Sequence, residues 1–130
     1  MNRPLALIVD DEPDILRVLS MSLRADGYEV VAAENGSEGL AAFEKEKPDI
    51  VITDIKMPGM DGFEVLDRIK GQSPATEVIV ITGHGDMELA IRSLKNDATD
   101  FITKPVDLAD LLRETADGGS SCWKTRALTS

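Results

Sequence analysis

The chain has 130 residues, 42% of them hydrophobic, and its 24 acids and 14 bases give a formal net charge of -10. This length fits one domain with one core, and the acidic balance opposes direct binding to nucleic acid or to anionic lipid. No apolar run approaches the roughly 20 residues that span a bilayer, and the single cysteine, Cys122, excludes an internal disulfide. We therefore expect a cytoplasmic protein that has no membrane association and that binds proteins or cations.

Five short apolar or β-branched runs predict strands. The first, third and fourth runs are nearly continuous, which is typical of strands covered on both faces, whereas the second and fifth are weaker, as edge strands are. The runs are LALIVD (5–10), YEVVAA (28–33), DIVIT (49–53), VIVIT (78–82) and DFIT (100–103).

Apolar residues at helical spacing follow each of these runs and predict five helices. The groups are Ile15, Leu19 and Leu23; Leu40 and Phe43; Phe63, Leu66 and Ile69; Met87, Ile91 and Leu94; and Leu108, Leu111 and Leu112. From about Ala116 the pattern gives way to DGGSS, a flexible composition. We therefore expect one domain over residues 1–116 and a flexible C-terminal tail over residues 117–130.

The alternation of strands and helices predicts an α/β fold, a doubly wound parallel sheet with helices on both faces. We expect a flavodoxin-like (βα)5 sandwich of three layers, with the five strands in the order 2-1-3-4-5. Ligands of such sheets bind beyond the carboxyl ends of the strands, where the strand order reverses. The polar residues that end or follow strands, and should share this rim, are Asp10, Asp11, Asp54, Thr82 and Lys104.

Three carboxylates on one rim call for a cation. Like charges about 4 Å apart repel by roughly 4 kcal/mol at an effective dielectric constant near 20. The hard oxygens of Asp10, Asp11 and Asp54 suit Mg²⁺, with Mn²⁺ as a substitute, and Lys104 adds a point charge suited to phosphate. Because carboxylates can form aspartyl phosphates, Asp54, alone on its loop, is the candidate acceptor.

Four motifs resemble, in order and spacing, the receiver domain of two-component response regulators. They are VDDE (9–12), TDIKMPGMDG (53–62), VITGHGD (80–86) and FITKP (101–105). The resemblance implies that Asp54 takes a phosphoryl group from the phosphohistidine of a sensor histidine kinase or phosphotransfer protein. It also implies a regulatory phosphoacceptor rather than an enzyme, with only Mg²⁺-dependent autophosphorylation and autodephosphorylation.

The same resemblance assigns roles around the acceptor. The implied metal ligands are Asp10, Asp11, Asp54 and the backbone carbonyl of Lys56. The implied phosphoryl-binding residues are Thr82 and Lys104, and the implied residues controlling access are Lys56, Gly83 and His84.

The resemblance also implies how the signal leaves the site. Thr82 and Phe101 would form the switch, with the ring turning inward as the hydroxyl approaches the phosphoryl group, and the bond from Lys104 to Pro105 would be cis. The output domain or protein would bind the face made by the fourth helix, the fifth strand and the fifth helix. A homodimer is left open.

Several residues have plainer interpretations. Asp10, Asp11 or Glu12 could cap the first helix, and we assign Asp61 mainly to capping the third. His84, between two glycines, fits an exposed loop residue.

Other protein classes share parts of the pattern. A phosphatase of the haloacid dehalogenase type also uses an aspartyl nucleophile, but it needs a second acid where this chain has Lys56. In a flavodoxin-like module, the acids of residues 10–12 would repel the phosphate of the flavin, which argues against that class. A receiver that binds partners without phosphate is a further alternative. Only the presence of Asp10, Asp11 and Asp54 together argues against it. The sequence fits a single-domain regulator and the receiver of a longer activator or hybrid kinase equally well, and we expect no DNA-binding domain within residues 1–130.

Overall fold

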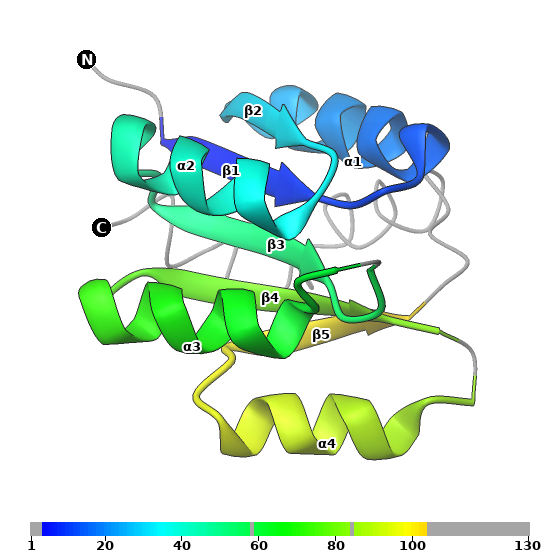
Figure 1. Ribbon diagram of the computed structural model, residues 1–130. Helices are drawn as coiled ribbons and strands as arrows, with labels where there is room; N and C mark the ends of the chain where they lie inside the picture. The colour runs from blue at the N-terminus through cyan, green and yellow to red at the C-terminus, as the bar shows by residue number, and fades with distance from the viewer. Residues whose placement is uncertain (1–3, 58, 84, 104–130) are drawn as a thin grey trace.

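The computed structural model describes residues 4–57, 59–83 and 85–103. Within these ranges strands and helices alternate strictly along the chain (Figure 1). The elements are β1 (Leu5–Val9), α1 (Pro13–Ala25), β2 (Glu29–Ala33), α2 (Gly36–Glu46), β3 (Ile50–Asp54), α3 (Gly62–Gln72), β4 (Glu77–Thr82), α4 (Met87–Lys95) and β5 (Asp100–Thr103). The helix expected near residues 108–112, the domain end at residue 116 and the tail over 117–130 lie outside the described residues.

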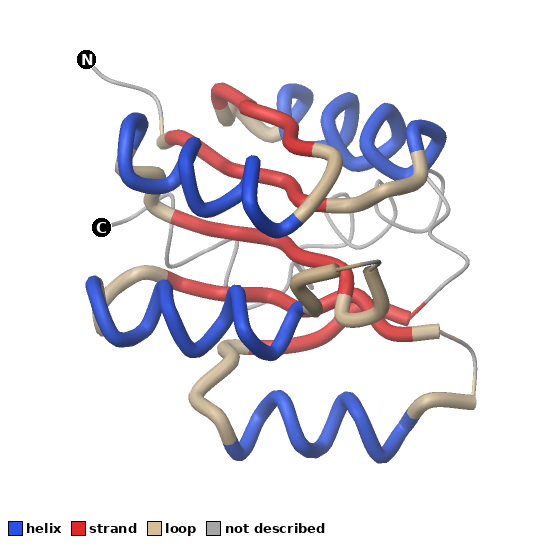
Figure 2. Tube along the Cα trace, in the orientation of Figure 1, coloured by secondary structure: helices blue, strands red, loops and turns tan. Residues whose placement is uncertain are grey.

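The strands form one sheet in the order β2-β1-β3-β4-β5, and every neighbouring pair is parallel. The predicted fold class and strand order are therefore confirmed. Helices α2 and α3 lie over one face of the sheet, and α1 lies over the other (Figure 2). Among the described residues, no helix combines the length and the apolar character needed to traverse a bilayer.

The burial of the strands follows their sequence patterns. Every residue of β3 is buried, and only the first residue of β1 and of β4 is partly exposed, whereas the edge strands β2 and β5 are mostly part-exposed. Alternate residues point to opposite faces. Val51 thus joins the core under α2 and α3, while Ile50 and Ile52 join the core under α1. Nearly continuous apolar runs are required because the central strands bury both faces.

Helix α4 is present as predicted, but the three apolar residues that predicted it face outward. Met87, Ile91 and Leu94 are 55%, 47% and 41% exposed, and the buried residues of the helix are Ala90 and Ser93. The hydroxyl of Ser93 donates to the backbone oxygen of Ala90 at 2.7 Å, so it needs no partner in the sheet. Ala90, Ser93 and the partly buried Leu89 therefore pack α4 against the domain and leave an apolar stripe outside.

Two helical glycines test this packing as a matched pair. A Cβ on Gly39 in α2 would lie 2.7 Å from Cγ2 of buried Val9, whereas a Cβ on Gly71 in α3 would meet nothing within 4 Å. We predict that Gly39→Ala lowers the free energy of unfolding by about 1 to 3 kcal/mol, because it overpacks the core. Gly71→Ala should raise it by about 0.5 kcal/mol, because alanine favours the helix. Urea titration measures both, and shifts in the same direction would contradict the close approach of α2 to β1.

Candidate functional site

Backbone pairing sets Asp10 and Asp54 side by side at the carboxyl edge of the sheet. Val9 pairs with Thr53 in the ladder between β1 and β3. The next residues along the sequence, Asp10 and Asp54, therefore also lie side by side, at the point where the strand order reverses. Both residues are buried, with 0% and 3% of their surface exposed.

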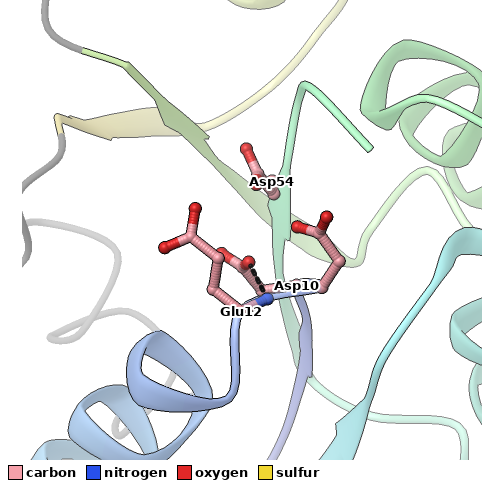
Figure 3. A group of neighbouring side chains, drawn as sticks. Asp10, Glu12 and Asp54 are labelled. Carbon is pink, nitrogen blue, oxygen red and sulfur yellow. Dashed lines mark hydrogen bonds between the residues drawn. The ribbon is translucent and has the colours of Figure 1, made fainter. Parts of the chain in front are cut away.

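Four acids gather at this junction of β1 and β3. Asp10, Asp11, Glu12 and Asp54 each offer a carboxylate oxygen, and these oxygens lie within 4.8 Å of one another. Figure 3 shows the labelled side chains of Asp10, Glu12 and Asp54 around this point. The structure thus brings together the three acids expected from the sequence and adds Glu12, which was considered only as a helix cap because it precedes the helical pattern.

Local hydrogen bonds fold the loop after β1 back toward the acids. The amide of Asp10 donates to the carbonyl of Ala33 at the end of β2 at 3.1 Å, and the amide of Glu12 donates to Oδ1 of Asp10 at 2.8 Å (Figure 3). Glu12 occupies the N-cap position of α1, but its side chain makes no capping hydrogen bond. Capping by the Glu12 side chain is therefore absent, whereas Asp61 caps α3 as predicted, accepting from the amide of Glu64 at 3.0 Å.

A close backbone contact fixes the loop that follows Asp54. The amide of Gly62 donates to the carbonyl of Ile55 at 2.9 Å. A Cβ on Gly62 would lie 2.3 Å from the backbone oxygen of Asp54, so only glycine fits there. The amide of Lys56 donates to Oδ1 of Asp54 at 3.3 Å. The start of α3 therefore lies directly against the backbone that presents the Asp54 carboxylate.

The remaining expected site residues lie at the neighbouring strands or outside the described ranges. Thr82 ends β4, is 2% exposed and pairs with Thr103 at the end of β5. Phe101, on β5, is partly buried and packs against the core under α2 and α3. The residues outside the described ranges are His84, Lys104 and Pro105, so their roles stay predictions.

Asp86 forms an ion pair with Lys56 that was not expected from the sequence. Its Oδ2 lies 3.0 Å from Nζ of Lys56. A Cβ on Gly83 would lie 2.7 Å from the same oxygen. We expected Gly83 to leave the site open. The space that its missing side chain leaves is bounded by the Asp86 carboxylate. No local pattern marks this contact, because the two loops are thirty residues apart in sequence.

The chemistry of this cluster fits a hard divalent cation. Its donors are all carboxylate oxygens, without histidine or cysteine, and such donors favour Mg²⁺ or Mn²⁺. Burial of Asp10 and Asp54 lowers the effective dielectric constant around them, which strengthens their mutual repulsion. Binding of a cation would relieve that repulsion.

Comparison with known proteins places the chain in a family. The profile of the response regulator receiver domain family matches residues 6–116. The chain belongs to this family. Among solved structures, this receiver superposes on a response regulator receiver domain protein from Clostridium thermocellum with a TM-score of 0.80 at 36% identity, covering 97% of this chain and 94% of that one. It superposes on the receiver domain of NtrX from Brucella abortus with a TM-score of 0.77 at 35% identity, covering 89% and 99%.

Curated relatives are longer than this receiver. It is 36% identical over 130 residues to the transcriptional regulatory protein GlrR of Escherichia coli K12, covering 95% of this chain and 29% of GlrR. It is 39% identical over 108 residues to the DNA-binding transcriptional regulator NtrC of Salmonella typhimurium, covering 83% and 23%. The receiver therefore spans less than a third of either relative's length.

The acid cluster predicts a stabilising response to Mg²⁺. At about ten times its Kd, Mg²⁺ should raise the free energy of unfolding by about 1.4 kcal/mol, or Tm by a few degrees. Asp11→Asn should remove more than half of this shift and should raise Tm in the absence of metal, because it relieves repulsion at an exposed ligand. Thermal unfolding in Mg²⁺ and in sodium chloride of equal ionic strength measures both effects. Asp67→Asn, an exposed acid on α3, is the matched control, and an Asp11→Asn variant with the full Mg²⁺ shift would contradict the site.

Proposed function

We propose that this receiver accepts a phosphoryl group on Asp54 from the phosphohistidine of a sensor histidine kinase or phosphotransfer protein in the cytoplasm. Phosphorylation then shifts the receiver to a conformation that controls an output partner. The observation that carries the proposal is the position of the Asp54 carboxylate within 4.8 Å of three further acids. A buried carboxylate in such a cluster can serve both as an anionic nucleophile and as a cation ligand.

The proposed transfer uses Asp54 as an oxygen nucleophile. An Asp54 oxygen forms a bond to phosphorus while the bond from phosphorus to the imidazole nitrogen of the donor breaks, and the imidazole keeps that electron pair. The amide of Lys56 holds Oδ1 of Asp54 and so orients the carboxylate. Mg²⁺, held by Asp10, Asp11, Asp54 and the carbonyl of Lys56, would neutralise charge on the cluster and on the phosphoryl oxygens.

Thr82 and Lys104 are proposed to bind the phosphoryl oxygens. The burial of Thr82 at the end of β4, beside the strand that carries Asp54, supports this role for its hydroxyl. A phosphoryl group can shift the conformation only through contacts that are better in one state. We assign this differential contact to Thr82 and the coupled packing change to Phe101, which already contacts the core.

The output partner is proposed to bind at α4, β5 and the helix expected near residues 108–112. The outward stripe of Met87, Ile91 and Leu94 supports this face, because exposed apolar residues at one helical spacing mark contact surfaces. A second receiver and a separate output domain or protein would both fit it. Because the net charge of -10 opposes binding of nucleic acid by this segment, we assign any contact with nucleic acid to the output partner.

Acceptor identity is tested by phosphoryl analogues and small phosphodonors. The wild type should bind beryllofluoride in the presence of Mg²⁺ and should incorporate one phosphoryl group from acetyl phosphate. Asp54→Asn should reduce both beryllofluoride binding and phosphoryl incorporation more than a hundredfold, because the nucleophilic oxygen is lost. Intact-mass spectrometry and ¹⁹F NMR provide the readouts.

The matched control is Asp61→Asn, which alters an acid on the same loop that caps α3. Because asparagine caps helices as well as aspartate does, this variant should change the free energy of unfolding by less than about 1 kcal/mol and leave phosphoryl incorporation unchanged. Incorporation by Asp54→Asn at the rate of the wild type would refute the assignment. Sustained release of phosphate from small phosphomonoesters would instead favour the phosphatase class.

A further inference from the structure

Helix α4 packs against β4 and β5, and its partly buried Leu89 contacts the core under α2 and α3. Ala90 and Ser93 are its buried residues. Its N-cap residue, Asp86, makes no capping hydrogen bond with its side chain. The Arg92 guanidinium lies 4.0 Å from the centre of the Phe63 ring and joins the middle of the helix to α3. Because three large apolar side chains of α4 are exposed rather than packed on the sheet, polar contacts at the start of the helix add to its attachment.

Lys56 joins the start of α4 to the acceptor. Its backbone amide donates to Oδ1 of Asp54 at 3.3 Å, while its ammonium group lies 3.0 Å from Oδ2 of Asp86. One residue thus contacts both the carboxylate proposed to be phosphorylated and the residue that precedes α4. A change of charge at Asp54 acts on Lys56 directly.

Gly83 makes room for this ion pair. Because a Cβ at residue 83 would lie 2.7 Å from Oδ2 of Asp86, any larger residue would push the carboxylate away. The Asp86 side chain is 25% exposed and that of Lys56 is 66% exposed. The ammonium of Lys56 is therefore the more exposed partner and has more freedom to move than the carboxylate of Asp86.

We propose that Asp86 is a positioning residue that, through Lys56, attaches α4 to the acceptor loop until Asp54 is phosphorylated. The proposal rests on phosphorylation of Asp54, the proposed function. Phosphorylation replaces the single negative charge of the Asp54 carboxylate with the roughly 1.5 to 2 negative charges of a phosphoryl group. These charges attract the ammonium of Lys56 and repel the carboxylate of Asp86, so they weaken the ion pair from both sides. Release of the pair loosens α4, whose outward stripe is the proposed output surface.

Amide hydrogen exchange of α4, followed by NMR, tests the proposal. Without beryllofluoride, Asp86→Asn and Lys56→Gln should each raise the exchange rates of the Met87–Lys95 amides about 1.5- to 5-fold, the range expected for an exposed ion pair. The double variant should exchange no faster than either single variant, because both remove one interaction. The coupling between the two substitutions is the ratio of the product of the single effects to the effect of the double variant. With beryllofluoride and Mg²⁺ bound, this coupling should fall below about 1.2-fold.

Glu88→Gln is the matched control, since it removes the same charge from the exposed first turn of α4. It should leave the exchange rates within about 1.3-fold of the wild type. An equal effect of Glu88→Gln and Asp86→Asn would overturn the proposal, as would a coupling that persists unchanged when ¹⁹F NMR shows beryllofluoride bound. If the wild type binds no beryllofluoride, the proposed function fails and this proposal fails with it. If it binds and the coupling persists, this proposal alone fails.

Discussion

Asp10 and Asp54 cannot separate without breaking the ladder between β1 and β3, because each directly follows or ends a paired strand. The turn bond from Glu12 to Asp10 adds further carboxylates to the same place. A sheet whose central strands are buried thus holds several like charges at one edge. The proposed affinity for a cation, and the proposed transfer of a phosphoryl group to Asp54 beside that cation, both depend on this enforced proximity.

The loops around the acids connect Asp54 to the starts of α3 and α4. Gly62 lets the start of α3 lie against the backbone of Asp54, so the acceptor has a rigid support. On the other side, Lys56 reaches Asp86 at the start of α4, a helix that leaves three large apolar side chains exposed. We therefore propose that a change at Asp54 acts on α4 through Lys56 rather than on α3.

The sheet and the acid cluster could be predicted because they depend on short local patterns. Continuous apolar runs identify β1, β3 and β4, and parallel strands place the residues after their carboxyl ends on one rim. Periodicity gives the spacing of Met87, Ile91 and Leu94 but not the direction they face, since Ala90 and Ser93 can also cover a sheet. Asp86 was missed because a contact between two distant loops leaves no pattern in sequence, and Glu12 because a turn rather than a strand brings it back to the cluster.

Paramagnetic broadening by Mn²⁺ tests most directly whether the enforced proximity of these acids creates one metal site. Small additions of Mn²⁺ to ¹⁵N-labelled protein should first broaden the amide signals of residues 9–13 and 53–57, and excess Mg²⁺ should restore them. Equal broadening at the acids of α2, such as Glu44 and Glu46, would show that Mn²⁺ senses only the general negative charge of the surface and would contradict the account.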